Sequence, residues 1–142
     1  MKKRRKILGP SKKEQMIHDV SSFLGSEYEE IAVAYLFGSF TTDGPFGDID
    51  LAVLISDDLD NPLGFEIDLE TALEEKVGLR VDVRILNRAP VSFCQNVIRT
   101  GKVILERDPN LRSDFQGKIL KQYFDFSRFR RRYLQEVVNA PL

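Results

Sequence analysis

The sequence predicts an α/β (α+β) domain in which a small mixed β-sheet is flanked by helices. Short apolar runs of strand length alternate along the chain with longer segments that carry apolar residues at helical spacing. The predicted order is helix, strand, strand, helix, strand, helix, strand, helix, with short connections. The 142 residues are 42% hydrophobic and 30% charged, which is typical of one globular domain with its own core. We therefore expect a single domain over residues 11–142, after a basic flexible tail over residues 1–10.

The tail contains five consecutive Lys or Arg residues at positions 2–6. A solvated, mobile segment is the simpler interpretation, and an arm that contacts RNA or an acidic partner is the alternative. The first helix is expected to have Ser11 as its N-cap, because Ser11 and Glu14 have the spacing of a capping box. It is expected to end at Gly25 in the left-handed conformation.

The next two elements are strands that flank a glycine-containing turn. Residues 31–37 form a continuous apolar run, which predicts a strand buried on both faces. Gly38 and Ser39 end this run, and a second strand is expected from Asp48 onward. Because side chains alternate along a strand, Asp48 and Asp50 should share one face while apolar residues occupy the other.

The second half of the chain repeats the alternation of helix and strand. Asn61 and Pro62 supply a cap and a first-turn proline for a helix that should stop at Gly78. Residues 79–86 alternate as a third strand, with Asp82 on its polar face. Three elements complete the order: a helix opened by Pro90 that ends before Gly101, a strand over residues 102–106, and a long C-terminal helix.

The C-terminal helix is rich in aromatic and basic residues, namely Tyr123, Phe126, Phe129 and Tyr133 with Arg128, Arg130, Arg131 and Arg132. One interpretation is a surface that docks a protein partner or nucleic acid. The other places the aromatic side chains in the core of the domain and the arginines in solvent.

Composition excludes several classes of protein. The net charge of −1 gives no overall bias toward nucleic acid, which is not expected as a direct substrate. The single cysteine, Cys94, excludes an internal disulfide and a cysteine-based zinc site. No run approaches the roughly 18 apolar residues of a membrane helix, and the basic start lacks the apolar stretch of a signal peptide. We expect a cytoplasmic protein without membrane contact.

The two carboxylates of the second strand predict a site for a hard cation. Residues two apart on one strand face lie roughly 6.5–7 Å apart at the backbone, so Asp48 and Asp50 can reach one Mg²⁺ or a close pair. Without a cation their charges would repel and raise one pKa. Asp82, at the matching end of a neighbouring strand, can complete the site and act as base toward an acceptor hydroxyl. Gly38 and Ser39 can hold phosphates, because glycine permits close approach and turn amides face an anion. The set predicts nucleotidyl transfer.

Each feature also has a plain structural interpretation. The Gly-Ser pair can be an ordinary turn, and aspartates are common at solvated strand ends. Asp82 can pair with Arg80 or Arg84, and Arg84 can alternatively contact the nucleotide. The combination of all the features at matching strand ends favours a metal and nucleotide site.

Three segments, residues 36–39, 48–53 and 81–83, resemble motifs of the nucleotidyltransferase superfamily related to DNA polymerase β. They are most similar to its minimal, single-domain branch, the MNT-type antitoxins of HEPN/MNT toxin–antitoxin pairs. The resemblance implies a polymerase β-like nucleotidyltransferase fold and an enzyme that uses Mg²⁺ and ATP. It also implies that AMP is transferred to a hydroxyl of a HEPN-type ribonuclease toxin, with tyrosine as the expected acceptor, and that the toxin is thereby inactivated.

The resemblance assigns a role to five residues: nucleotide binding to Gly38 and Ser39, and metal binding with catalysis to Asp48, Asp50 and Asp82. Two departures from the pattern leave an alternative open. Only eight residues separate Ser39 from Asp48, where about ten are usual, and Gly47 stands where serine is common. The alternative is an antitoxin that neutralises its partner by binding alone. Transfer to a small molecule such as an aminoglycoside ranks last, because the larger relatives that do this have an additional domain.

Overall fold

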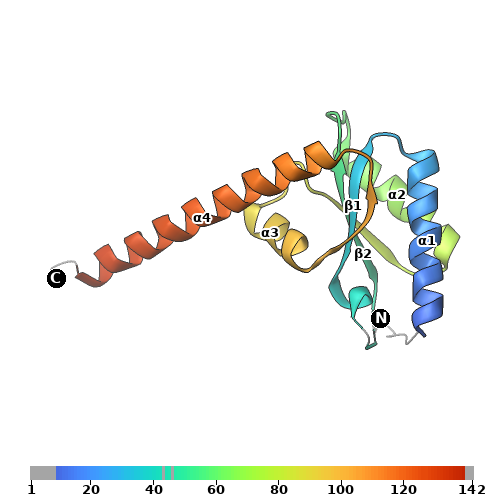
Figure 1. Cartoon of the computed structure of the whole chain (residues 1–142), viewed down its shortest axis with the longest axis horizontal. Helices are drawn as coiled ribbons and strands as arrows, with labels where there is room; N and C mark the ends of the chain where they lie inside the picture. Colours follow the sequence, from blue (N-terminus) through green and yellow to red (C-terminus); the bar gives the residue numbers. More distant parts are fainter. Residues whose placement is uncertain (1–8, 43, 46, 140–142) are drawn as a thin grey trace.

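The computed structural model describes residues 9–42, 44–45 and 47–139, so the basic segment over residues 1–8 lies outside the described part of the chain. The described elements follow the predicted order, with one short 3₁₀ helix added after the first strand (Figure 1). They are α1 (Pro10–Glu27), β1 (Ile31–Phe37), η1 (Gly38–Thr41), β2 (Ile49–Ile55), α2 (Pro62–Val77), β3 (Val81–Ile85), α3 (Val91–Thr100), β4 (Lys102–Glu106) and α4 (Pro109–Asn139).

The four strands form one mixed sheet, as the sequence predicts, and their spatial order is β3-β2-β1-β4. β1 runs antiparallel to both β2 and β4, whereas β2 and β3 are parallel. Figure 1 shows α1 and α2 on one side of the sheet and α3 with the start of α4 on the other. Both faces of the central strands are therefore covered by helices, as is usual where strands read as continuous apolar runs.

Two apolar clusters fill the layers on either side of the sheet. One joins Leu24 of α1 and Leu69 of α2 to one sheet face, and the other joins Val97 of α3 and Ile119 of α4 to the opposite face. The first six residues of β1 are buried, which confirms the prediction of a strand enclosed on both faces. The central strands are thus held by core packing from both sides.

The ends of α1 differ from the prediction. The helix begins at Pro10 with Gly9 as N-cap and no side-chain cap, because proline is preset for the first helical position. It also continues through Gly25 to Glu27. The Arg107 guanidinium, from the connection after β4, donates to the backbone oxygens of Leu24, Gly25 and Tyr28 at 3.1, 2.6 and 3.1 Å. A distant side chain therefore satisfies the helix end that local sequence assigns to a glycine cap.

Both ends of α2 confirm the prediction. The Asn61 side-chain oxygen accepts a hydrogen bond from the Gly64 amide at 3.0 Å, and Pro62 occupies the first turn. Gly78 ends the helix with φ of 70° in the left-handed region.

Helix α2 also covers the outer edge of β3. Three strand amides that point away from β2 each donate to a glutamate of α2: Val81 to Glu74 at 3.1 Å, Val83 to Glu70 at 3.4 Å and Ile85 to Glu66 at 2.9 Å. These carboxylates replace the strand partner that an edge lacks, which discourages edge-to-edge pairing.

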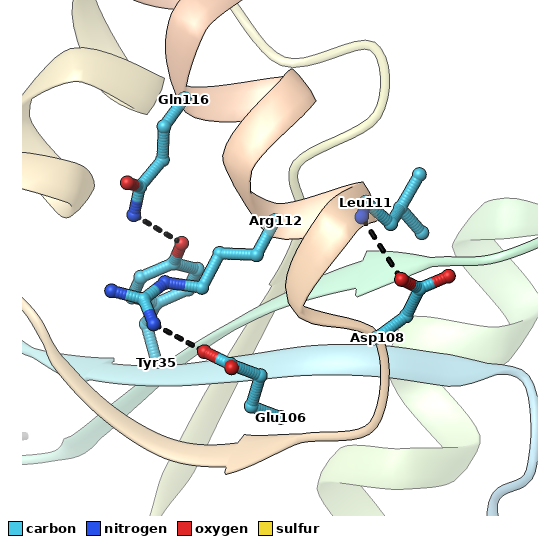
Figure 2. A network of polar contacts seen from close by, with 6 residues as sticks. All are labelled: Tyr35, Glu106, Asp108, Leu111, Arg112 and Gln116. Atoms are coloured by element: carbon cyan, nitrogen blue, oxygen red, sulfur yellow. Dashed lines mark hydrogen bonds and ion pairs between the residues drawn. The ribbon is translucent and has the colours of Figure 1, made fainter.

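Helix α4 is anchored only at its start. Asp108 accepts from the Leu111 amide at 3.0 Å, Arg112 forms an ion pair with Glu106, and Gln116 donates to the Tyr35 hydroxyl at 3.0 Å (Figure 2). Beyond Ile119 the helix projects away from the sheet and helices (Figure 1). Its aromatic side chains are exposed in this chain, so the prediction that they belong to its core is wrong. Within the described residues, no helix has both the length and the apolarity needed to cross a membrane.

Candidate active site at one end of the sheet

The predicted site residues lie where β1 ends and where β2 and β3 begin. Phe37, the last residue of β1, pairs with Asp50 of β2, and Asp50 pairs in turn with Asp82 of β3. The backbone register therefore places Phe37, Asp50 and Asp82 in one row across three strands, and Gly38 follows Phe37 directly as the first residue of η1. The side chains of Asp50 and Asp82 are half-buried and exposed, respectively.

Gly38 is required by the close approach of Asp50. Its φ of 76° lies in the left-handed region, which L side chains rarely adopt. A Cβ atom at this position would lie 2.3 Å from Asp50 Oδ2. The carboxylate therefore sits against the bare backbone of the turn, and any larger residue would displace it.

Ser39 ties the loop after β1 back to its own start. Its hydroxyl accepts a hydrogen bond from the Gly47 amide at 3.3 Å, and its carbonyl accepts from the Thr42 amide at 3.1 Å. β2 begins at Ile49, so Asp48 precedes the strand instead of opening it. Strand alternation therefore does not place Asp48 on the face of Asp50, and its half-buried position is set by the turn that Ser39 closes.

The face that carries Asp82 also carries Arg84, and two aromatic rings lie beside it. The Arg84 guanidinium lies 5.8 Å from the centroid of the Phe93 ring, and the Phe93 and Phe37 rings meet edge to face at 5.5 Å. Among the described ion pairs none joins Asp82 to an arginine, so the predicted alternative of a simple Asp82–Arg pair is not observed. A cationic and aromatic shelf therefore borders the carboxylates.

A cavity of about 390 Å³ opens along this shelf. Arg84 and Phe93 line it, together with Asn87 and Arg88 from the connection between β3 and α3. Its size falls in the range that accepts a small organic ligand. None of the five predicted site residues lines the cavity, and most of its wall is formed by residues at the other end of β2 and β3, so only Arg84 and Phe93 connect it to the carboxylates.

Lys13 of α1 is a site residue that sequence reasoning missed. The loop after Ser39 contains no Lys or Arg, but the fold brings Lys13 to it from 27 residues earlier. Lys13 Nζ donates to the carbonyl oxygens of Phe40 and Thr42 at 3.2 and 2.5 Å and lies 5.3 Å from the centroid of the Phe40 ring. A positive charge thus holds the turn that would face phosphate. No local sequence signal could have found it, because α1 and the loop meet only in the folded chain.

The donor set fits Mg²⁺ of the kind that a nucleotide completes. Asp50 and Asp82 are neighbours in register and offer the oxygen ligands that a hard cation prefers. In the described part of the chain, no group of three or more His, Cys, Asp or Glu side chains forms a protein-only metal site. The three predicted ligands Asp48, Asp50 and Asp82 therefore do not form such a group in this structure.

The sheet order, the Gly-Ser turn and the paired aspartates define a nucleotidyltransferase. The family model of polymerase beta-type nucleotidyltransferases matches residues 20–110, which contain all five predicted site residues. The chain belongs to this family.

Among its relatives is the protein adenylyltransferase MntA of Shewanella oneidensis, which is 31% identical over 125 residues, covering 84% of this chain and 85% of the relative. The fold is similar to that of the MNT antitoxin in the complex with tri-AMPylated HEPN toxin from Shewanella oneidensis, with a TM-score of 0.69 and 25% identity over 89% of this chain and 98% of that one. A toxin–antitoxin structure with AMP-PNP gives a TM-score of 0.70 and 27% identity, covering 86% and 98% of the respective chains.

Proposed function

We propose that this chain is an antitoxin that transfers AMP from Mg-ATP to a hydroxyl, with tyrosine as the expected acceptor, of a cognate HEPN-type toxin and thereby inactivates it. The observation that carries the proposal is the pairing of Asp50 with Asp82 in neighbouring strands of a nucleotidyltransferase sheet, with the Gly38 turn directly against the Asp50 carboxylate. The similarity to MntA and to MNT antitoxins solved with an AMPylated toxin and with AMP-PNP supports it.

In this proposal the turn at the end of β1 holds the phosphates of ATP. Gly38 lets the triphosphate approach the backbone, and Ser39 with the amides of η1 donates to the β- and γ-phosphates. Lys13 keeps the turn in place through the carbonyls of Phe40 and Thr42. The adenosine end of the nucleotide has the shelf of Arg84 and Phe93 beside it.

The carboxylates carry the chemistry. Asp48, Asp50 and Asp82 would hold Mg²⁺, which neutralises charge that develops on the α-phosphate when it is bound. The oxygen of the acceptor hydroxyl attacks the α-phosphorus, and the bond from that phosphorus to the oxygen bridging to the β-phosphate breaks. Pyrophosphate leaves, and the hydroxyl proton passes to the Asp82 carboxylate. The products are an AMP ester on the toxin and pyrophosphate.

In this proposal the acceptor hydroxyl comes from another molecule. The described residues form one sheet with its helices, and the catalytic row opens at the end of that sheet, with no second unit to present a hydroxyl. A protein partner in the cytoplasm, rather than nucleic acid, is the expected source of that hydroxyl.

The test is transfer of label from ATP to a cognate HEPN-type toxin in the presence of Mg²⁺, with the label on the α-phosphate in one sample and on the γ-phosphate in another. We expect label from the α-phosphate only, and no label with the Asp48→Asn, Asp50→Asn double variant. If the toxin is inhibited equally by this variant and remains unlabelled by the wild-type chain, the protein acts by binding alone. The short loop between Ser39 and Asp48 is the observation that favours that second function.

A further inference from the structure

The projecting half of α4 exposes more apolar surface than any other helix in the described chain. Nine large apolar side chains between residues 120 and 138 are 36–81% exposed: Leu120, Tyr123, Phe124, Phe126, Phe129, Tyr133, Leu134, Val137 and Val138. At 1.5 Å per residue this segment is about 28 Å long. Contiguous apolar surface of this extent on a soluble protein indicates an interaction site. We call residues 120–138 the distal segment of α4.

The apolar side chains occupy an unusually wide arc of the distal segment. At 100° per residue, the nine positions span roughly 220° of the helix circumference, from Phe129 round to Phe124. A helix that packs against one flat surface needs a stripe of only about 100°. One helix from a second copy of this chain would therefore leave about half of the arc in water. The width fits a groove formed by several elements of a different protein.

Charge further restricts the partner. Arg130 and Arg131 fall inside the apolar arc, Arg128 lies near its edge and Arg132 lies on the opposite side, whereas Asp125 and Glu136 are the only acidic residues of the distal segment. Two copies of the segment in contact would bring these arginine clusters together. A groove with carboxylates at its rim would pair with them.

The distal segment also leaves the domain on the sheet face that carries Asp50, while α4 itself starts at the opposite end of the strands. Ala52 and Leu54, which follow Asp50 on the same face of β2, belong to the apolar cluster that contains Val97 of α3 and Ile119 of α4. Helix α4 therefore starts from the sheet face that carries Asp50, and Figure 1 shows it extending outward beyond α3. A partner bound to the distal segment is held on that face.

We propose that the distal segment of α4 is the docking element for the protein that accepts the nucleotide, and that it inserts into a groove with an apolar floor and acidic rim on that protein. The inference rests on the proposed function for the identity of the partner, the HEPN-type toxin. It assigns partner binding and catalysis to separate parts of the chain, so that substitutions in one need not affect the other.

The experiment compares two double variants of the full chain. Phe126→Ser with Tyr133→Ser removes two aromatic rings from one stripe of the arc. Lys121→Ser with Asp125→Ser is the matched control, because it alters two exposed positions on the opposite side of the helix and leaves the net charge unchanged. Measurements are the Kd for unmodified toxin, the KM for toxin and the kcat in α-label transfer, and the Kd for AMP-PNP.

We expect the aromatic variant to weaken toxin binding and raise the KM for toxin at least tenfold. Its kcat at saturating toxin and its affinity for AMP-PNP should stay within twofold of the wild type, and the control should change nothing. Unchanged toxin affinity in the aromatic variant would overturn the inference. So would sedimentation showing that the wild type alone is a dimer and the aromatic variant a monomer. Toxin binding is measured without transfer, so an absence of labelling in the wild type would refute the proposed function and leave this test intact.

Discussion

The end of the sheet with the candidate active site and the distal segment of α4 both carry residues that the sequence singles out, but different forces fix their positions. At the sheet end, Asp50 pairs in register with Phe37 and Asp82, and the strands behind it are buried between two helical layers. In the distal segment, Phe126 and Phe129 are 63% and 68% exposed and contact no core of this chain. The first region is preorganised by intramolecular packing, and the second presents its apolar surface for another molecule to cover.

The difference indicates that chemistry and partner binding place different structural demands on the two regions. A catalytic row needs positions fixed within fractions of an ångström, which a sheet with both faces packed supplies. A recognition helix can instead gain its packing on binding. Substitutions at the sheet end should therefore affect chemistry and stability, whereas substitutions in the distal segment should affect association alone.

The largest expected effect is that of Asp50→Asn on transfer. The change keeps the shape of the side chain but removes the charge that the proposed mechanism requires beside the α-phosphate. We expect the rate of α-label transfer to fall by about 10²–10³, equivalent to roughly 3–4 kcal/mol. Glu29→Gln, at an exposed carboxylate just before β1 and at the other end of the sheet, is the control and should retain wild-type transfer. Equal transfer rates for the two variants would mean that the Asp50 carboxylate is not required for transfer.

Gly38→Ala should damage both stability and transfer. The new Cβ would lie 2.3 Å from Asp50 Oδ2. The alanine would also have to adopt the φ of 76° that Gly38 has in this turn. Positive φ alone costs about 1–3 kcal/mol, and displacement of Asp50 adds to the loss of activity. Urea unfolding together with transfer assays checks both effects. Gly44→Ala is the control, because a Cβ there meets nothing within 4 Å; a Gly38→Ala protein as stable and active as this control would contradict the geometry.

Lys13→Met should affect nucleotide binding with little effect on the chemical step. The variant keeps the length of the side chain but loses the donors to Phe40 O and Thr42 O. A loss of about 1 kcal/mol in holding the turn should raise the KM for ATP roughly fivefold while kcat is kept. Lys13→Arg should restore most of the affinity. Lys12→Met, at the neighbouring exposed lysine, serves as control, and an equal rise in KM for both variants would indicate a general charge effect.

The proximity of the candidate site residues could be predicted from sequence, whereas the contacts that support them could not. Apolar runs define β1 and β2, and the strand ends that they imply bring Gly38, Asp50 and Asp82 together without further information. Lys13 reaches its loop across 27 residues, and Arg107 reaches the end of α1 across 82. Such contacts depend on the assembled fold and leave no local pattern, which is why no sequence motif points to Lys13 at this loop or to Arg107 at the end of α1.

For the distal segment, the secondary structure could be predicted from sequence, but the surroundings of its side chains could not. Its helical state follows from local sequence, but the same aromatic residues suit a core or an interface. Which of the two applies depends on where α4 leaves the sheet, and that is fixed by the anchors of Asp108, Arg112 and Gln116 (Figure 2). The expectation that Asp48 belongs to β2 is wrong for a related reason, because the Ser39–Gly47 hydrogen bond makes this position part of a turn.

A smaller, pH-dependent effect is expected at the edge of β3. Burial raises the pKa of Glu70 above its ordinary value of 4.5, the Val83 amide opposes this shift, and the charges of Asp82, Glu74 and Glu66 add to it. A carboxyl with a raised pKa contributes its full stability below pH 4.5 and loses it as the pH rises through the folded-state value. Glu70→Gln keeps an oxygen acceptor for Val83 without the charge. We expect the variant to unfold at equal or higher urea concentration than wild type at pH 7, with the difference closing at pH 4. Glu75→Gln, an exposed neighbour on α2, should show no such trend.

The smallest effect should follow truncation of an aromatic ring in the distal segment. Phe129→Ala removes a side chain that is 68% exposed, so little burial is lost on folding and the free energy of unfolding should change by less than about 0.5 kcal/mol. Leu69→Ala in α2 removes a fully buried side chain and should cost about 2–5 kcal/mol. Thermal or urea unfolding of both variants, each without toxin, makes the comparison. A destabilisation of 2 kcal/mol or more by Phe129→Ala would mean that the distal segment is already packed in the free protein, and the contrast between a prepacked site and an uncovered docking helix would be lost.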